Sequence, residues 1–563
     1  MVLDLGFLLV LAMASAGLGL RIVRRFGPMP EHPGDALALA LPLGLGMLAL
    51  GVLALGGVGW MNARALAGLL GVAGAVGLSG AVGSLRDLFR ATWARAASGI
   101  TPHPALPLKG GGFSLLEGEN KENPPPLRGR AGWGVDTQRE RNLLPRPSWA
   151  WDVPLAIVLL GTLLTALAPV TDGDALCYHL QVPKVFLATG SVGFDPDLHE
   201  TVYPLLTELL YAMALALRGP VACRLVQWLL GVVFALNVAG VARPILGDRA
   251  RWAAAVALLV PAVSNGMGAP LNDVALAAFG NAALFAWTRW LDRPTVGAAA
   301  LAGCLAGLAM GVKYPALVLT ALIGLTMVVP RPRLRHALLF GGVALLVGGV
   351  WYARAYVYTG NPVYPFFRHV FGGAGLDVVL DPIKRPMPAT PWNLLTALVP
   401  MTLQPARFDS VSHQLGPLFL LVLPALFLER APRRVWAIVA IGYAFLTLCL
   451  TQRQSMRFVL IAVGPMAVGV AWVASRWWDR RTVPARALAV LLVGCLAFEA
   501  SIAAARARHG LGVVLGRESA SDFLARREPT YRVGRWVDAN LPPEARIVGQ
   551  DHRGYYIPRS YAM

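Results

Sequence analysis

The densest group of polar side chains in the sequence directly follows an apolar stretch. Asp172, Asp174 and His179 lie within one short segment there. Two carboxylates and an imidazole could hold a divalent cation, since such ions prefer oxygen ligands and the manganese class also accepts imidazole. A carboxylate at this place could instead act as a general base for a hydroxyl nucleophile. An acidic turn that merely caps the next helix would have the same composition, so the spacing leaves three interpretations open.

One further acid and two cations stand at the ends of other apolar stretches. Asp273 lies so close to apolar sequence that a functional role is favoured, although it could also cap the helix that follows. Lys313 could extend its amine to the membrane interface, or bind a phosphate as a point charge. Arg457 carries a planar fork of donors that suits phosphate. Lys313 and Arg457 are therefore candidates for binding a phosphate.

The composition defines the kind of scaffold that must position these residues. Of 563 residues, 56% are hydrophobic and only 14% are charged, and the mean hydropathy is +0.57. A soluble domain has roughly a quarter of its residues charged. The chain is therefore predicted to be an integral membrane protein, which excludes a disordered chain and a collagen. Its five cysteines form no CxxC pair, which argues against a disulfide framework or a zinc module.

The apolar stretches predict an all-α polytopic membrane protein. A helix needs about 20 apolar residues to cross a bilayer, and the chain has about 14 stretches near that length. They are centred on 3–20, 36–58, 64–83, 151–170, 221–242, 252–268, 272–290, 295–312, 315–330, 336–353, 414–428, 435–450, 457–475 and 485–505. The segment 204–217 is short and contains Glu208, so we expect it to lie along the membrane interface.

The positions of the basic residues predict the topology. The formal net charge is +19, which in a soluble protein would suggest nucleic acid as a partner. Here every basic cluster follows an odd-numbered stretch, for example Arg24 and Arg25 after the first. Because such clusters mark cytoplasmic loops, both chain ends are predicted to lie outside, and nucleic acid is not expected as a partner. Asp174, Asp273, Lys313 and Arg457 then all lie at the outer face.

Several motifs resemble the GT-C membrane glycosyltransferases, specifically bacterial relatives of protein mannosyltransferase and of lipid A aminoarabinose transferase (glycosyltransferase family 39). The segments Asp174 to Pro183, Gly311 to Pro315 and Trp351 to Pro365 carry the resemblance in this order, followed by Arg457-Phe458. The resemblance covers about 150–560. Its most specific part is the block Asn361-Pro362-Val363-Tyr364-Pro365.

The resemblance implies an activity and a location. Such enzymes pass a sugar from a polyprenyl-phosphate donor to a hydroxyl of a glycan, lipid or protein. The expected protein is thus a hexosyl- or pentosyltransferase of the bacterial cytoplasmic (inner) membrane, with its site facing the periplasm or exterior and with inversion at the sugar. The rival functions are a transporter and a glycan ligase or polymerase that uses lipid-diphosphate donors. No internal repeat supports the transporter.

The resemblance also implies roles for single residues. Asp174 is the expected catalytic base, with Asp172 as its competitor. Asp174, Asp273 and His179 would hold a divalent metal (Mg or Mn) where one is used, and Lys313 and Arg457 would bind the donor phosphate. Further substrate contacts are expected from Tyr178, Tyr203, Tyr314, Asn361 and Tyr364.

The chain is predicted to have four parts. Residues 1–95 would form three N-terminal transmembrane helices. The Pro- and Gly-rich segment 96–147 would be a disordered cytoplasmic insert, with a basic docking loop as the alternative. Residues 148–505 would form the GT-C-like core, with interfacial helices in its catalytic outer loop 171–203 and a lid in the loop 366–413. Residues 506–563 would form a small periplasmic C-terminal segment.

Overall fold

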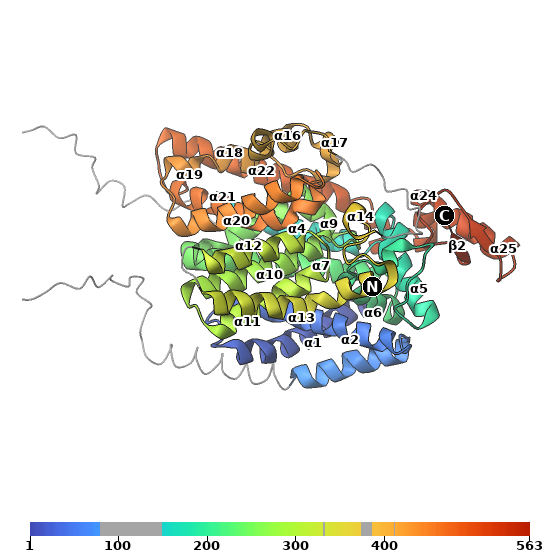
Figure 1. The fold of residues 1–563 in the computed structure, drawn as a ribbon. Coiled ribbons are helices and arrows are strands. Elements are labelled where there is room, and N and C mark those ends of the chain that lie inside the picture. The colour runs from blue at the N-terminus through green and yellow to red at the C-terminus, as the bar shows by residue number, and fades with distance from the viewer. Residues whose placement is uncertain (79–148, 330–332, 373–384, 410, 563) are drawn as a thin grey trace, which may run out of the picture. The chain divides into compact units, whose positions relative to one another are not determined.

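In a computed structural model of the chain, residues 1–78, 149–329, 333–372, 385–409 and 411–562 are described (Figure 1). They belong to one unit of the molecule. The insert predicted at 96–147 and residues 373–384 of the predicted lid loop lie outside the described residues, as does the end of the third predicted helix.

The described residues are almost entirely helical, which confirms the predicted fold class. The first half contains α1 (Val2–Phe26), α2 (Pro33–Gly57), a third helix (Ala63–Leu78), α4 (Trp149–Ala166), the π-helical turn η2 (Ala175–His179), α5 (Gln181–Thr189), η3 (His199–Val202), α6 (Leu206–Leu217), α7 (Pro220–Leu246), η4 (Gly247–Arg249), α8 (Ala250–Leu259), α9 (Pro261–Met267), α10 (Asp273–Asp292) and α11 (Val296–Met310).

The second half continues with α12 (Ala316–Val328), α13 (Leu334–Thr359), α14 (Arg368–Phe371), α15 (Pro391–Leu395), α16 (Leu398–Leu403), α17 (Pro405–Phe408), η5 (Val411–His413), α18 (Leu418–Val422), α19 (Ala425–Leu428), α20 (Arg433–Leu450), η6 (Arg457–Ala462), α21 (Val463–Trp477) and α22 (Val483–Ala507). The chain then forms α23 (Leu511–Val514), α24 (Ala520–Arg527), α25 (Pro529–Asn540), β1 (Arg546–Val548) and β2 (Ser560–Ala562), and the two strands pair in parallel.

Eight helical stretches among the described residues are long and apolar enough to cross a membrane, and five shorter apolar helices accompany them. The protein is thus a multi-pass membrane protein, but the expected count of about 14 crossings is not confirmed. Proline breaks two of the predicted stretches: Pro261 separates α8 from α9, and Pro424 lies between α18 and α19. The residue before a proline tends to avoid helical geometry, and Val260 before Pro261 has ψ of 120°, whereas Leu423 before Pro424 keeps helical dihedrals.

Helix α10 is the centre of the bundle, and nearly every residue from Asp273 to Trp290 is buried. It packs against α7, α11 and η6. The neighbouring pair α11 and α13 approaches closely at Gly307 and Gly348. A Cβ atom on Gly348 would lie 2.7 Å from the carbonyl oxygen of Gly307, so only a residue without a side chain permits this contact.

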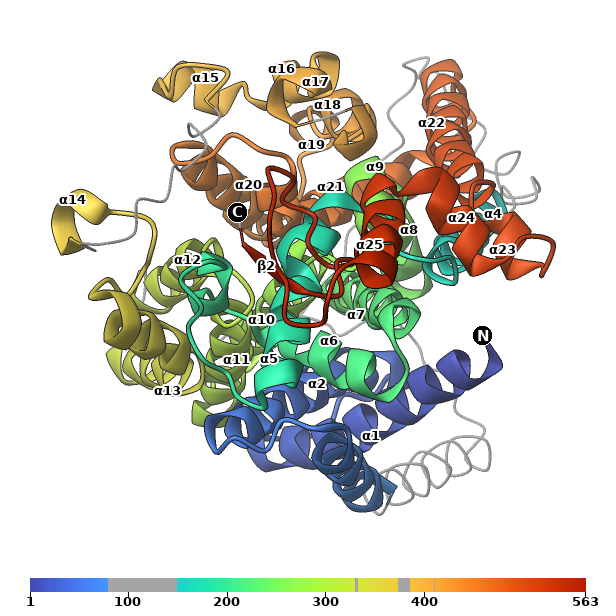
Figure 2. The same ribbon diagram turned by 90° about the vertical axis from the view of Figure 1, so that its right-hand side faces the viewer.

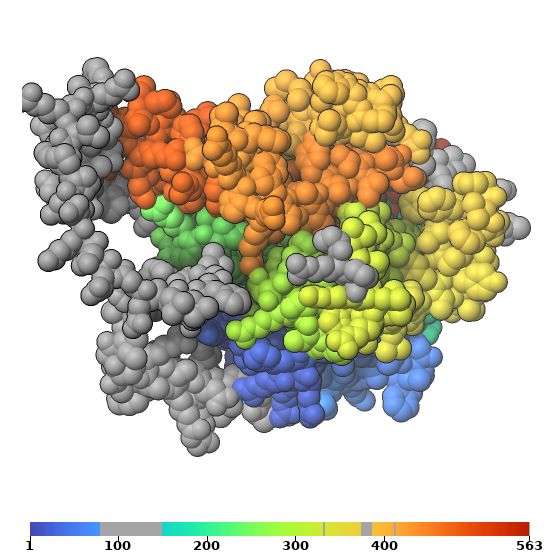
Figure 3. All heavy atoms as spheres, turned by 60° about the vertical axis from the view of Figure 1, so that its left-hand side comes forward, coloured from blue at the N-terminus to red at the C-terminus, as the bar shows by residue number. Residues whose placement is uncertain are grey.

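The N-terminal helices cover one side of the core, and α2 packs against α6 and α7. In Figure 3 they are the blue atoms beside the green and yellow-green helices. Two ion pairs tie them to the core: Arg218 donates to Asp4 at 3.1 Å, and Arg243 donates to Asp35 at 2.9 Å. Helices α1 and α2 are therefore anchored to the core by charged as well as apolar contacts.

One end of the bundle, the loop end, carries η2, α5, η3 and the C-terminal helices and strands, at the right of Figure 1. Figure 2 looks onto this end and shows α25 and β2 in front of the bundle near α5. Helix α6 is covered by α2, α5 and α7, and its residues Leu206–Ala214 are buried. The predicted interfacial position of 204–217 stays a prediction.

Candidate active site

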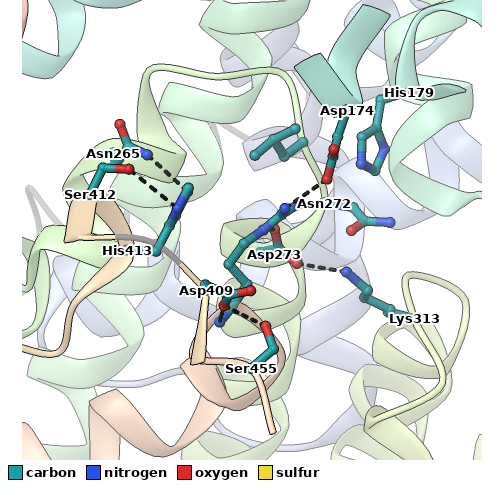
Figure 4. Close-up of polar contacts among 12 residues, drawn as sticks. Asp174, His179, Asn265, Asn272, Asp273, Lys313, Asp409, Ser412, His413 and Ser455 are labelled. Atoms are coloured by element: carbon teal, nitrogen blue, oxygen red, sulfur yellow. Dashed lines mark hydrogen bonds and ion pairs between the residues drawn. The ribbon is translucent and has the colours of Figure 1, made fainter. Parts of the chain in front are cut away.

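The site is built around the guanidinium of Arg457, which lies between two carboxylates. Its Nη1 donates to Asp174 Oδ2 at 2.7 Å, and its Nε donates to Asp273 Oδ2 at 2.7 Å. The second oxygen of Asp273 accepts from Lys313 Nζ at 2.6 Å. Four predicted residues from distant parts of the sequence therefore form one cluster of alternating charge, part of which Figure 4 shows.

Each member stands at the end of a helix at the loop end. Asp174 immediately precedes η2, and Arg457 begins η6. Asp273 is the first residue of α10, where the positive end of the helix dipole favours a carboxylate. Lys313 lies in the turn between α11 and α12, with its amine 4.1 Å from the centre of the Phe458 ring. Because the helices are packed against one another, charged residues at their ends have little freedom to move.

Asp273 is the structural centre of the cluster. Its side chain is 2% exposed and meets two cations. A buried carboxylate is costly unless it is paired and hydrogen-bonded, and here both oxygens are. Asp273 in turn holds Lys313 and Arg457 side by side, although two cations at this separation would repel each other without it.

Asp174 differs from Asp273 in its exposure. Its side chain is 46% exposed, so molecules in the adjacent cavity can reach it. Its partial burial favours the neutral form, but the charge and hydrogen bond of Arg457 outweigh this effect and lower the pKa of Asp174 below its ordinary value. Asp174 is therefore ionised at neutral pH and can accept a proton.

Asp172, the competing candidate, lies apart from this cluster. Its Oδ2 is 3.5 Å from Nη2 of Arg224, a buried residue of α7. Arg224 also donates to the carbonyl oxygens of Ala168 and Pro169, at 3.0 and 2.5 Å. This arrangement fixes the chain between α4 and η2, so Asp172 contributes to the position of the loop.

Among the described residues, Asp174, Asp273 and His179 are not grouped as a metal site, and their predicted metal role stays a prediction. His179 is fully buried, and its Nδ1 contacts Glu208 Oε1 at 2.6 Å. The two aspartates are already paired with Arg457. Within the described ranges, no group of three or more His, Cys, Asp or Glu side chains could hold a metal ion. In this structure the guanidinium of Arg457 lies between the two carboxylates, where a shared ion would have to bind.

Glu208 was not expected at the site. This 1%-exposed residue of α6 contacts His179, and its Oε1 also accepts from Asn272 Nδ2 at 3.2 Å. Glu208 therefore links His179 of η2, which follows Asp174, to Asn272, which precedes Asp273. The signal in the sequence was a single carboxylate in the otherwise apolar stretch 204–217.

Removing the charge of Glu208 should disturb the relative position of the two acids. We expect Glu208→Gln to lower kcat of the reaction proposed below by about tenfold, because misplacement of a catalytic group by about 1 Å costs up to 10²-fold. The KM of the donor should change less than threefold. Thermal unfolding in detergent serves as the control, and an unchanged kcat would exclude this positioning role.

Asp409 is the second residue at the site, after Glu208, that was not predicted. The sequence did not distinguish it from the other charged residues of the loop 366–413. Its Oδ2 accepts from Ser455 Oγ at 2.5 Å and from the backbone N–H of Arg457 at 3.3 Å. It thus holds the backbone from which the Arg457 side chain extends. His413, in the same loop, lies 2.9 Å from Asn265 of α9.

The predicted substrate contacts fall into two groups. Tyr178 packs on His179, and Tyr203 packs on Tyr314, with centroid distances of 4.0 and 6.2 Å. Asn361 and Tyr364 are both fully buried. The Asn361 amide donates to Phe366 O and accepts from Val363 N–H, so it holds the turn together, and the predicted contact of both residues with substrate stays a prediction. Tyr314 Oη donates to the Tyr364 carbonyl at 2.6 Å, which joins the turn to the site.

A depression of about 530 Å³ that is widely open to solvent, called the cavity below, adjoins Asp174. Its lining residues come from the start of η2 and from the C-terminal segment: Gly173, Asp174, Cys177, Gln550, Asp551, His552 and Arg553. Burial raises the pKa of the Cys177 thiol to about 12, so it is protonated at neutral pH and is no nucleophile. The sequence contains no signal that residues so distant would share one cavity.

A known family matches the central part of the chain. The sequence model of the dolichyl-phosphate-mannose-protein mannosyltransferase family matches residues 202–351. The predicted resemblance to the GT-C glycosyltransferases is confirmed. The matched segment contains Glu208, Asp273 and Lys313, whereas Asp174 and Arg457 lie outside it. The match indicates a glycosyltransferase.

Solved structures of two proteins are among those that resemble this chain. ArnT from Cupriavidus metallidurans, solved with undecaprenyl phosphate, is 16% identical and has a TM-score of 0.48, with 74% of this chain and 86% of that chain covered. The oligosaccharyltransferase of Archaeoglobus fulgidus, solved with Zn and sulfate, is 16% identical and has a TM-score of 0.44, with 72% and 62% covered. No curated protein matches the sequence.

Proposed function

We propose that the protein transfers a sugar from a polyprenyl-phosphate donor to an acceptor hydroxyl at the outer face of the bacterial cytoplasmic (inner) membrane. The observation that carries this proposal is the cluster of Asp174, Arg457, Asp273 and Lys313 beside a solvent-accessible cavity. The family description names dolichyl phosphate mannose, a lipid-linked sugar, as donor, which supports this donor class. The sugar is a hexose or a pentose.

Lys313 and Arg457 are the groups that would bind the donor phosphate. Each uses only part of its hydrogen-bonding capacity on the described carboxylates, since Lys313 makes one such bond and Arg457 makes two with its side chain. A phosphate can therefore be added without removing Asp273. Cations held in this way stabilise the charge that develops on the leaving phosphate.

Asp174 is the proposed base. The acceptor oxygen forms a bond to the anomeric carbon while the bond from that carbon to the phosphate oxygen breaks. The hydroxyl proton passes to Asp174, and the electron pair leaves with the polyprenyl phosphate. A single displacement of this kind inverts the anomeric centre.

The same geometry couples donor binding to base strength. In the resting site Arg457 lowers the pKa of Asp174, which makes it a weak base. A phosphate that engages Arg457 offsets the positive charge that Asp174 experiences. The pKa of Asp174 then rises, so the base is strongest when the donor is in place.

No step in this mechanism uses a metal, because the carboxylates are paired with cationic side chains. We expect the purified enzyme to keep at least about 80% of its activity after treatment with EDTA. The measurement is initial transfer rate with and without added Mg²⁺ or Mn²⁺. Loss of activity on chelation, with recovery on adding either ion, would contradict the assignment of charge neutralisation to Lys313 and Arg457.

The function is tested in proteoliposomes with radiolabelled undecaprenyl-phosphate hexoses and pentoses. Release of undecaprenyl phosphate, together with label in an acceptor, supports the proposal, and NMR of the product gives the anomeric configuration. The transporter alternative predicts counterflow of free sugar with no consumption of donor. A lipid-diphosphate donor that is used instead would indicate the ligase or polymerase alternative.

A further inference from the structure

The C-terminal segment 550–553 forms one wall of the cavity whose other wall is the start of η2. Asp174 belongs to both the cavity and the charge cluster, whereas Lys313 and Arg457 do not line the cavity. The proposed phosphate-binding groups therefore contact Asp174 from one side, and the cavity adjoins it from another. A base that contacts the proposed donor-binding groups on one side and the cavity on another suits a reaction that joins two substrates.

The segment is bonded to the catalytic loop at several points. Lys184 Nζ in α5 donates to the carbonyl oxygens of Tyr555 and Ile557, at 2.9 and 2.6 Å. The backbone N–H of Tyr555 donates to Leu176 O at 3.2 Å, and Tyr556 Oη donates to Val170 O at 2.8 Å. Burial in this contact lowers the pKa of Lys184 to about 8. These bonds place the wall of the cavity at a defined position relative to η2.

Asp551 and Arg553 of the wall are also fixed by hydrogen bonds within the C-terminal segment. Arg553 Nε donates to Asp551 Oδ1 at 2.9 Å, and Arg553 Nη1 donates to Glu528 Oε1 at 3.1 Å, where Glu528 is 1% exposed. The hydroxyl of Tyr561 also donates to the carbonyl of Asp551. Asp551 is therefore fixed in place before any ligand binds, which reduces the entropy lost on binding.

Two side chains of the wall remain available for a ligand. Gln550 and His552 are exposed, and neither side chain makes a hydrogen bond to the part of the chain that the structure describes. Together with the carboxylates of Asp551 and Asp174, they provide both donors and acceptors. Apart from Gly173 and Cys177, every lining residue carries a polar or charged side chain. Side chains that both donate and accept hydrogen bonds suit a ligand rich in hydroxyl groups.

We propose that this cavity is the acceptor site, that its acceptor is a carbohydrate, and that Gln550 and His552 bind the hydroxyl groups of that carbohydrate. The proposal rests on the function proposed above, since it takes Asp174 as the base. A volume of about 530 Å³ lies within the range of small-molecule sites. The reacting hydroxyl then meets Asp174, while the rest of the acceptor contacts the C-terminal wall.

The test uses the full-length protein in proteoliposomes with the donor panel described above. The acceptor probes are p-nitrophenyl hexosides and pentosides, with a serine- and threonine-containing octapeptide as the comparison. We expect transfer to at least one glycoside and none to the peptide. In the double variant Gln550→Ala and His552→Ala, the KM for that glycoside should rise at least tenfold, while kcat changes less than threefold.

Glu544→Gln is the matched control, because Glu544 is an exposed acid of the same C-terminal segment that does not line the cavity. Its KM for the glycoside should equal that of the wild type. Transfer to the peptide with inert glycosides, or an unchanged KM in the double variant, overturns the carbohydrate assignment. Donor cleavage with water as acceptor is measured in parallel. If the wild type cleaves the donor and Asp174→Asn does not, the proposed function holds even where the carbohydrate assignment fails.

Discussion

Replacing Asp174 by asparagine should lower kcat for sugar transfer by about 10³-fold, because it removes the group that accepts the proton of the attacking hydroxyl. Asparagine keeps the volume of the side chain and can still accept a hydrogen bond from Arg457. The binding site for the donor phosphate should therefore persist. We expect the affinity for undecaprenyl phosphate, measured by calorimetry in detergent, to change less than threefold, so the loss appears in kcat.

Asp172→Asn provides the matched comparison, since the two acids are close in sequence and differ in their partners. Asp172 contacts Arg224, which is itself bonded to backbone carbonyls. We expect this variant to be less stable to heat and to lose less than tenfold in kcat. Near-normal turnover in Asp174→Asn with a large loss in Asp172→Asn would transfer the role of base to Asp172.

The sequence predicted the members of the charge cluster because topology alone brings them together. Asp174, Asp273, Lys313 and Arg457 were each expected at a helix end on the same face of the membrane, and helix ends of one face meet when the bundle packs. Which cation pairs with which acid was beyond such reasoning. Pairing depends on side-chain directions that only the packed helices define.

His179 illustrates where spacing fails. Its distance along the sequence from Asp174 allowed a shared ion, but the imidazole faces Glu208 from α6. The partner lies 29 residues away in sequence, in a stretch whose burial could not be read from composition. A buried histidine needs a hydrogen-bond partner, and for His179 this partner is Glu208, a buried carboxylate of the apolar helix α6.

The predicted count of about 14 crossings is not confirmed, for a related reason. Hydropathy measures the length of an apolar run, whereas Pro261 and Pro424 divide runs that are continuous by composition. The C-terminal wall was also beyond prediction, since backbone groups of Tyr555 and Ile557, just after residues 550–553, bond the carbonyl of Leu176 and the side chain of Lys184. Backbone contacts leave no trace in the types of the residues that make them.

Arg457→Gln should have the second large effect, on the donor and on the pH profile together. The variant removes one of the two cations proposed for the phosphate, so KM for the donor should rise at least tenfold. It also removes the charge that lowers the pKa of Asp174. The partial burial of Asp174 and the charge of Asp273 then outweigh the smaller lowering effect of His179, so we expect the pKa of Asp174 to rise above the ordinary aspartate value.

The sign of the pH effect follows from this change. In the wild type the lowered pKa keeps Asp174 ionised as the pH falls, so kcat/KM should stay flat from pH 8 down to about pH 5, well above the ordinary aspartate pKa of about 3.9. In Arg457→Gln the residual kcat/KM should fall across that range, because Asp174 becomes protonated within it. Arg453→Gln is the control: Arg453 stacks on the same Phe458 ring as Lys313, at 4.7 Å, and makes no ion pair with Asp174 or Asp273. A parallel pH profile in both variants would show that Arg457 acts on the phosphate alone and leaves the base unchanged.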